Sequence, residues 1–131
     1  MNVKYAVQAV ILNDKNEVLA VSRKDNHLDF GLPGGKVEED DLLMTDAIAR
    51  EVYEETGLII DVWSMELVFS MHRNKYMGFT YYIKDWEGEI NTKEPHIVKW
   101  TNFGEITNGS FGEWNSLVAD SMESMGIKIK R

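Results

Sequence analysis

The sequence predicts an α+β domain or an α/β/α layered domain around a mixed β-sheet. Segments rich in β-branched and aromatic residues lie on both sides of an acidic helical stretch, and a second helical stretch follows late in the chain. No internal repeat, low-complexity tract or linker interrupts the sequence. With 131 residues, the chain has the length of one domain, residues 1–131, with a modest core.

The N-terminal part predicts two strands joined by a turn. Residues 3–12 are mostly apolar and β-branched, and they lead into a cluster of turn formers at 13–16, NDKN. Residues 17–23 have the composition of a second strand, so we expect the two strands to form a hairpin. The polar loop 25–30 follows, and its lone histidine, His27, is expected to face water.

The centre of the chain, residues 31–58, predicts a glycine-rich loop followed by a helix. Glycine and proline are costly inside regular structure, and four of them open this stretch: Gly31, Pro33, Gly34 and Gly35. Asp40 or Asp41 can cap the positive end of the helix. Gly57 stands where a left-handed residue is expected to end it.

Two further strands are predicted after this helix. Residues 58–70 are rich in aliphatic and β-branched side chains, and residues 75–86 are rich in aromatic ones. His72 and Arg73 lie at the expected turn between the two strands. They would meet a substrate phosphate or, more simply, face water.

A turn at 87–91 and a break at Glu94-Pro95 separate these strands from a short one at 97–103. A loop is predicted for residues 104–112. Residues 113–125 return to helical periodicity, with one apolar stripe expected to pack in the core: Trp114, Leu117, Val118, Met122 and Met125. After this helix, Ile127 and Ile129 alternate with lysines and predict an edge strand or an extended tail.

Three glutamates crowd one face of the central helix. Glu51, Glu54 and Glu55 follow i, i+3, i+4 spacing, and like charges at such spacing destabilise a helix by roughly 0.2–0.5 kcal/mol per pair. A solvated acidic face is the usual explanation for such a cluster. A glycine-rich loop leading directly into the cluster favours a site for a hard divalent cation, since magnesium prefers carboxylate and phosphate oxygens.

This central stretch resembles the Nudix hydrolases, in particular the MutT-like nucleotide pyrophosphohydrolases. The family pattern is G-x5-E-x7-R-E-U-x-E-E-x-G-U, where U is a bulky aliphatic residue. Residues 50–58, REVYEETGL, match its second half at every specified position, and residues 34–38, GGKVE, look like its usual entry.

The middle of the pattern departs from the family. Fourteen residues lie between Gly35 and Arg50, where the pattern has thirteen. Counting forward from Gly35 puts Asp41 at the position of the first glutamate, whereas counting back from Arg50 puts Leu42 there. Leucine cannot do the work of a carboxylate, so we infer a one-residue insertion with Asp41 as the stand-in.

The resemblance implies a Nudix-type sandwich and a divalent metal, Mg2+ or Mn2+. Glu51, Glu54 and Glu55 would be metal ligands, and Gly35 would lend its backbone carbonyl. Glu54 and Glu55 would also be catalytic, because one of the helix glutamates, or an acid elsewhere, would be the base for the attacking water. Arg50, grouped with these catalytic residues, resembles the family's structural arginine, which helix carboxylates orient, rather than a direct catalyst.

The reaction implied is hydrolysis of a nucleoside diphosphate linked to a moiety X. The favoured substrate is a nucleoside triphosphate, or a modified one, cut to the monophosphate and pyrophosphate. An RNA 5′-end pyrophosphohydrolase is an alternative, which 22 acidic against 14 basic residues and a formal charge of −8 disfavour. A non-catalytic nucleotide sensor is another, but such proteins usually lose the carboxylates that this chain keeps.

Four residues are candidates for substrate contacts outside the metal ligands: Arg23, Phe30, Asp41 and Glu94. Phe30, like other strand aromatics of this chain, would stack on a base or pack in the core. Glu94 lies in a segment, residues 86–100, that resembles a stretch of family members acting on nucleoside triphosphates. It would supply an acid outside the box or form a surface salt bridge.

Cellular context follows from absences in the sequence. The chain has no cysteine, which excludes disulfides and thiolate chemistry. The N-terminal residues lack the long apolar run of a signal peptide or a membrane span. We therefore expect a cytoplasmic protein with a nucleotide as its partner, no membrane contact, and a monomeric or homodimeric state.

Overall fold

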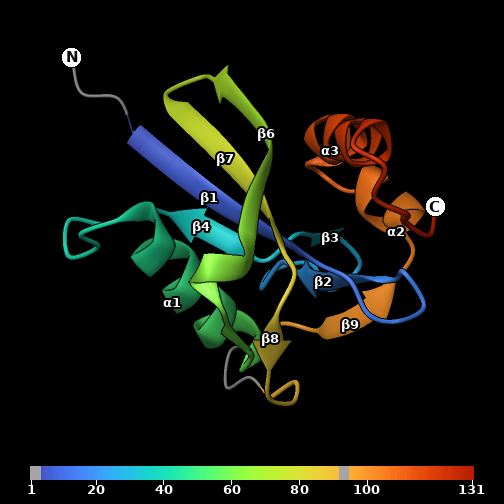
Figure 1. Cartoon of the computed structure of the whole chain (residues 1–131), viewed down its shortest axis with the longest axis horizontal. Coiled ribbons are helices and arrows are strands. Elements are labelled where there is room, and N and C mark those ends of the chain that lie inside the picture. The colour runs from blue at the N-terminus through green and yellow to red at the C-terminus, as the bar shows by residue number, and fades with distance from the viewer. Residues whose placement is uncertain (1–3, 92–94) are drawn as a thin grey trace.

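The structure is a computed structural model that describes residues 4–91 and 95–131. Figure 1 shows helix α1 on one side of a central sheet and helices α2 and α3 on the other. The predicted α+β sandwich around a mixed sheet is therefore confirmed. In chain order the elements are β1 (Lys4–Ile11), β2 (Val18–Ser22), β3 (Phe30–Gly31), β4 (Gly34–Lys36), α1 (Met44–Thr56), β5 (Ile59–Ile60), the 3-10 turn η1 (Val62–Ser64), β6 (Met65–Arg73), β7 (Tyr76–Ile83), β8 (Trp86–Glu87), β9 (Val98–Thr101), α2 (Phe103–Thr107) and α3 (Gly112–Ser124).

The central sheet has the strand order β4-β1-β7-β6. Strand β1 pairs in parallel with β7 over its whole length, from Lys4 opposite Tyr76 to Ile11 opposite Ile83. The pairings of β1 with β4 and of β6 with β7 are antiparallel, so the sheet is mixed. Strand β1 thus lies inside the sheet with a partner on each edge.

The predicted hairpin of the first two strands is wrong beyond its turn. A single bridge joins Leu12 and Val18 across the turn. Because β4 and β7 occupy both edges of β1, strand β2 cannot continue beside it. Instead, β2 joins β3 and β9 in a second sheet, and β5 pairs with β8 in a third.

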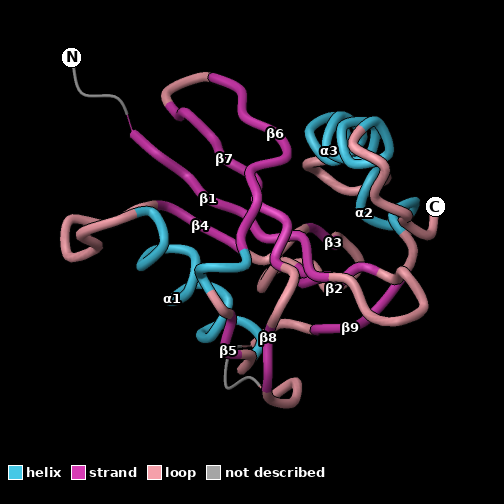
Figure 2. Tube along the Cα trace, viewed as in Figure 1, coloured by secondary structure: helices cyan, strands magenta, loops and turns pink. Residues whose placement is uncertain are grey.

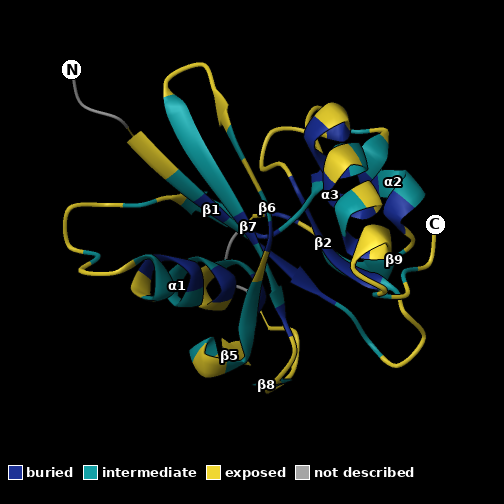
Figure 3. Ribbon diagram, turned by 45° about the horizontal axis from the view of Figure 1, so that its top comes forward, coloured by how far each residue is buried: buried dark blue, intermediate teal, exposed yellow. Residues whose placement is uncertain are grey.

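Each face of the central sheet has its own hydrophobic cluster, and Figure 3 shows the buried sides of α1 and α3 turned inwards. The side chains of β1 alternate between the two. The cluster under α1 contains Val7, Ala9, Ile11, Ile48 and Val52. The cluster under α3 contains Val10, Phe103, Trp114, Val118 and Met122. Two further residues of β1 on this second side, Ala6 and Gln8, line a cavity instead.

The expected cap of α1 is wrong at its start and confirmed at its end. The segment between β4 and α1 is a loop (Figure 2), and the residue at the cap position is Leu43 rather than Asp40 or Asp41. The Leu43 N–H is satisfied by the carboxylate of Asp46 at 3.1 Å. At the other end, Gly57 has φ 83° and donates its N–H to the Tyr53 carbonyl.

The strand predicted at 58–70 is interrupted. The 3-10 turn η1 separates β5 from β6, because the Asp61 carboxylate accepts the Trp63 N–H and holds a tight turn there. Strand β6 then runs on to Arg73, so His72 and Arg73 lie in its last residues rather than in the turn. The predicted strand at 75–86 ends at Ile83, and its last residue belongs to β8.

The loop predicted at 104–112 begins with a short helix, α2. Asn102 caps it by accepting the Glu105 N–H. The following helix α3 buries three members of the expected stripe, whereas Leu117 and Met125 are exposed. Beyond α3 the chain is an extended tail rather than a strand, bound through the Lys130 N–H to the Asn16 carbonyl.

None of the helices in the described ranges combines the length and the apolar composition needed to cross a bilayer.

Candidate active site

A cavity of about 790 Å³ lies beside the central sheet on its α3 side. Small side chains form part of its lining on β1 and β7, namely Ala6 and Gly78. Trp114 of α3 contributes an aromatic wall. Charged residues of both signs line the same cavity: the basic Arg23, Lys24, Lys36 and Arg73, and the acidic Asp25, Asp29 and Glu55. Such a cavity suits an anionic ligand that also carries an apolar ring.

Helix α1 reaches this cavity through Glu55. The Oε1 atom of Glu55 accepts the backbone N–H of Gly34 at 2.7 Å, and both residues line the cavity. The backbone carbonyl of Glu55 lies 2.8 Å from Nε2 of the buried His96, which also lines the cavity. The end of the acidic helix is therefore fixed against the glycine-rich loop on one side and the β9 segment on the other.

Glu51 packs against the same loop. A methyl group placed on Gly35 would lie 2.7 Å from the Glu51 carboxylate, so only a glycine permits this approach. The side chain of Glu51 is 15% exposed. Burial raises the pKa of Glu51 above its ordinary value, against the lowering effect of its hydrogen bond from Arg50.

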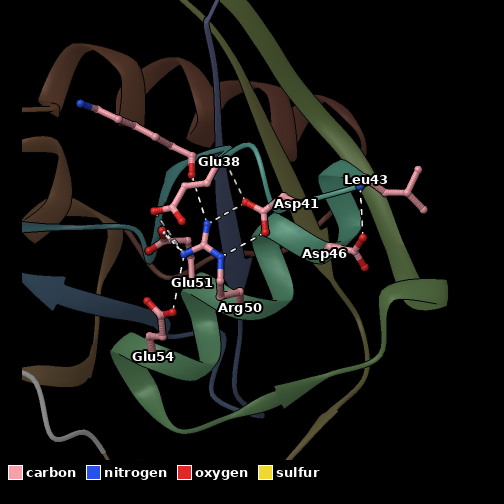
Figure 4. Close-up of polar contacts among 8 residues, drawn as sticks. Glu38, Asp41, Leu43, Asp46, Arg50, Glu51 and Glu54 are labelled. Atoms are coloured by element: carbon pink, nitrogen blue, oxygen red, sulfur yellow. Dashed lines mark hydrogen bonds and ion pairs between the residues drawn. The ribbon is translucent and has the colours of Figure 1, made fainter.

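Arg50 lies in the middle of the carboxylates, as Figure 4 shows. Its Nε and Nη2 atoms donate to the two oxygens of Asp41 at 3.1 and 2.8 Å. Its Nη1 atom donates to Glu51 at 2.9 Å and lies 3.6 Å from Glu54. Glu38 completes the group at 3.9 Å. One guanidinium therefore offsets part of the repulsion that the spacing of the glutamates creates.

The Asp41–Arg50 pair is the strongest interaction of this group, because it is bidentate and charged on both sides. The hydrogen bond from Arg50, together with one from the Glu38 N–H at 2.8 Å, holds the pKa of Asp41 below its ordinary value. The hydrogen bond to Asp41 likewise raises the pKa of Arg50. Leu42, which the other alignment of the pattern places at the position of the first glutamate, is 88% exposed. The geometry therefore favours Asp41 as the stand-in at the junction.

No group of three or more His, Cys, Asp or Glu side chains within residues 4–91 and 95–131 forms a ready metal cluster. The donor chemistry nevertheless fits a hard divalent cation. Two of the three glutamates contact the glycine loop, Glu55 through the Gly34 N–H and Glu51 beside Gly35, and carboxylate and backbone carbonyl oxygens are the donors that such a cation prefers. The space that a Cβ on Gly35 would fill is the place where Glu51 approaches that loop.

The four candidates for substrate contacts fall in different places. Arg23 lines the cavity and pairs with Asp25 at 3.3 Å. Phe30 is 5% exposed in the cluster under α3, with the Lys99 ammonium 4.2 Å from its ring centre, so little of the ring is left for stacking on a base. Asp41 is bound to Arg50 instead of lining the cavity. Glu94 lies outside the described residues.

Several cavity residues were not singled out from the sequence. Gln8 is a polar residue within an apolar strand, which is the one local signal that was available. Phe111 is 49% exposed at the start of α3 and lines the cavity. It is positioned by the Ser110 N–H, which donates to Asp29 at 2.9 Å across 81 residues of sequence. No local pattern predicts a contact between segments so far apart.

Comparison with known proteins identifies relatives along almost the whole chain. The family model described as NUDIX domain matches residues 3–119. An 8-oxo-dGTP diphosphatase of Buchnera aphidicola is 28% identical over 117 residues, which cover 88% of this chain and 89% of the relative. A MutT-like protein of Streptomyces ambofaciens is 26% identical over 126 residues, covering 95% of this chain and 80% of the relative.

Solved structures show the same fold. The solution structure of the E. coli ORF135 protein has a TM-score of 0.77 at 22% identity, with 96% of this chain and 92% of that chain covered. The crystal structure of a MutT NUDIX hydrolase from Burkholderia pseudomallei has a TM-score of 0.67 at 24% identity, with 79% and 86% covered.

Proposed function

The chain belongs to the Nudix hydrolase family, and from this premise we propose that it is a metal-dependent nucleotide pyrophosphohydrolase. Its substrate would be a nucleoside diphosphate linked to a moiety X. A nucleoside triphosphate or a modified form of one is favoured, with the nucleoside monophosphate and pyrophosphate as products. The 8-oxo-dGTP diphosphatase among its relatives supports a triphosphate with a modified base as the first substrate to test.

One observation carries the proposal: the acidic helix and the cavity share the Gly34–Gly35 loop. Glu55 binds the N–H of Gly34, and Glu51 packs on Gly35. Both glycines line the cavity, whose basic residues suit a polyphosphate. A substrate held in this cavity would present its phosphates to the glutamates of α1.

Glu51, Glu54, Glu55 and the carbonyl of Gly35 would hold a Mg2+ or Mn2+ ion. When bound, such an ion offsets charge on the phosphoryl oxygens and makes a coordinated water more acidic. Residues of the chain would position the metal ligands and accept the proton. Arg50 holds Glu51 in place, and a carboxylate of the helix would accept the proton of the attacking water.

The two alternatives have less support. An RNA 5′-end pyrophosphohydrolase would need a wide basic surface for the chain of phosphates that follows the first nucleotide. The formal charge of −8 opposes that, although four basic residues line the cavity. A sensor without activity would not need three crowded glutamates, since their repulsion has a cost to the fold.

The test is a panel of nucleoside triphosphates, oxidised nucleotides, ADP-ribose, dinucleoside polyphosphates and nucleotide sugars, each incubated with Mg2+ and analysed by chromatography. We expect hydrolysis that requires the metal and rises towards alkaline pH, because the attacking water must lose a proton. Glu54→Gln should lower the rate by orders of magnitude without loss of the fold. Full activity in excess chelator, or no hydrolysis of any compound, would contradict the proposal.

A further inference from the structure

We propose that Gln8 is a specificity-determining residue of the cavity and that its side-chain NH2 group donates to a carbonyl oxygen of the substrate's base. The inference rests on the proposed function, because it concerns the nucleotide bound in the same cavity. It commits the site to bases that carry a keto group at the contacted position, such as hypoxanthine, guanine and uracil. Adenine and cytosine carry an amino group at the corresponding position.

A line of three polar side chains fixes the Gln8 side chain. Trp114 on α3 donates its Nε1–H to Oγ1 of Thr80 at 3.0 Å, and Thr80 on β7 donates its hydroxyl to Oε1 of Gln8 at 3.1 Å. Gln8 and Thr80 are direct partners in the parallel pairing of β1 with β7. Thr80 is fully buried and Trp114 is 6% exposed, so water cannot replace these bonds.

The direction of these bonds follows from the chemistry of the groups. An indole nitrogen can only donate, so the Thr80 oxygen must be the acceptor of that bond. The Thr80 hydroxyl proton then needs an acceptor of its own, and a buried unpaired donor costs about 1–3 kcal/mol. The Gln8 carbonyl supplies this acceptor, whereas the opposite orientation of the amide would point a second donor at the Thr80 oxygen and leave the Thr80 proton without an acceptor.

Locking the carbonyl leaves the NH2 group as the part of Gln8 available to a ligand. Gln8 is half-buried and lines the cavity. Within the described part of the chain, the only hydrogen bond of its side chain is the one from Thr80. The cavity therefore presents a donor, held in one orientation, that a bound molecule can use.

The surroundings of Gln8 suit a flat ring. Ala6 and Gly78 flank it on the same face of β1 and β7, and neither has a side chain larger than a methyl group. Trp114 packs so closely on Gly78 that a Cβ there would lie 2.8 Å from its indole ring. Phe69 supports the indole edge-on, with ring centres 4.9 Å apart. These contacts fix the position of the tryptophan beside the Gln8 amide.

A donor held in this way discriminates between keto and amino groups. Guanine O6 and the O4 of uracil or thymine accept a hydrogen bond, whereas the N6 amino group of adenine and the N4 amino group of cytosine donate one. A free glutamine side chain would rotate to suit either. Because Thr80 holds the carbonyl, the Gln8 NH2 group would donate to the oxygen of a keto base. An amino group at the same position would place two donors against each other.

The experiment compares two matched pairs, inosine against adenosine and uridine against cytidine. The α,β-methylene triphosphates, which resist hydrolysis at the α–β bond, give dissociation constants by calorimetry with Mg2+. The parent triphosphates give kcat/KM. Wild-type protein should bind the keto member of each pair roughly tenfold more tightly, as expected for one hydrogen bond and the avoided clash of donors.

Three variants test the lock. Gln8→Leu removes the donor and should bring both keto-to-amino affinity ratios close to one, because the keto ligands lose a hydrogen bond and the amino ligands lose a clash. Thr80→Val keeps the shape of the side chain but removes the hydroxyl that holds the Gln8 amide, so the keto-to-amino affinity ratios should also fall. Thr101→Val is the matched control. The Thr101 hydroxyl donates to Glu105 at 3.2 Å, and Thr101 does not line the cavity, so the affinity ratios of this variant should equal those of wild type. Melting temperatures show whether each variant is folded.

The outcomes separate the inference from the proposed function. Equal binding of both members of a pair by wild type, or a preference that survives Gln8→Leu and Thr80→Val, would overturn the role of Gln8. An equal loss for all four ligands in Gln8→Leu would overturn it too, because Gln8 would then serve the ribose, the phosphates or the fold. A keto preference in binding without any hydrolysis would contradict the proposed function but support the role of Gln8. Hydrolysis without a keto preference would support the proposed function but contradict the role of Gln8.

Discussion

Arg50 faces four carboxylates with a single positive charge. Asp41 takes two of its hydrogen bonds, Glu51 takes one, and Glu38 and Glu54 lie within 4.0 Å. The acidic residues therefore have different roles. Asp41 holds the arginine, and the arginine holds Glu51 beside the glycine loop.

We therefore expect Asp41→Asn to act on stability more than on the reaction. Its side chain is 6% exposed, and hydrogen bonds to charged groups contribute about 1.5–3 kcal/mol, so the variant should lose about that much stability at pH 7. Because folding lowers the pKa of Asp41, this contribution is fully present above the unfolded value of about 3.9 and is lost progressively as pH falls from there through the lower pKa of the folded state. Urea unfolding of both proteins at pH 7 and pH 3 measures the difference.

The rate of the same variant places Asp41 relative to the chemistry. Asp41→Asn should lower turnover modestly at saturating metal, whereas Glu54→Gln should lower it by orders of magnitude. If Asp41→Asn were the slower of the two, the insertion at the junction would be wrongly placed. A stability gap that stays constant down to pH 3 would show that Asp41 is not the titrating partner of Arg50.

At the scale of elements, the approach of α1 to β4 depends on one missing side chain. Gly35→Ala would put a methyl group 2.7 Å from the Glu51 carboxylate, so the helix or the glutamate must shift. We expect activity to fall at least tenfold, because misplacement by about 1 Å can cost about a hundredfold in rate. The response of the rate to Mg2+ concentration should move to higher metal.

Gly31→Ala is the stability control for this variant. A methyl group there meets nothing closer than 4.0 Å, so its melting temperature should remain near that of wild type. Steady-state rates over a range of Mg2+ concentrations, read beside melting curves, give the result. An active Gly35→Ala with an unchanged metal response would show that the distance between β4 and Glu51 does not matter.

The elements that the sequence predicted well are those with a long, one-sided pattern. Helix α1 and its terminator Gly57 are of this kind, and so is most of α3. Helix α2 was missed because five residues, one of them Gly104, are too short to show a period. The break between β5 and β6 was missed because it depends on the Asp61 side chain capping a 3-10 turn inside an otherwise apolar run.

At the scale of the whole molecule, the sequence predicted one half of the candidate site. The box of glutamates is contiguous, so its spacing on a helix could be read directly. The residues that build and support the cavity wall are not contiguous: Gln8, Thr80 and Trp114 come from β1, β7 and α3, and the first two are 72 positions apart in the sequence. Only the topology that places β1 beside β7 brings them together, and no pattern in the sequence predicted that pairing.

The parallel pairing of β1 with β7 also bears on how the chain folds. Strand β1 is the first strand described, and the strand with which it forms its longest pairing, β7, lies 72 positions away in the sequence. Closing a loop of this length costs conformational entropy before the contacts between the strands can form. Strands β6 and β7 need only residues 74–75 to meet. The hairpin of β6 and β7 should therefore form early in the folding transition state, with β1 docking against it late.

Refolding and unfolding rates in urea would test this order. Asn74→Ala disturbs the turn, where Asn74 has φ 56°, and should mainly slow refolding. Val7→Ala removes buried contacts of β1 and should mainly speed unfolding, because those contacts would form after the barrier. Equal slowing of refolding by both variants would mean that β1 docks early. With β1 docking late, the cavity floor would be completed among the last events of folding, and a ligand seated on it would slow unfolding by holding that strand in place.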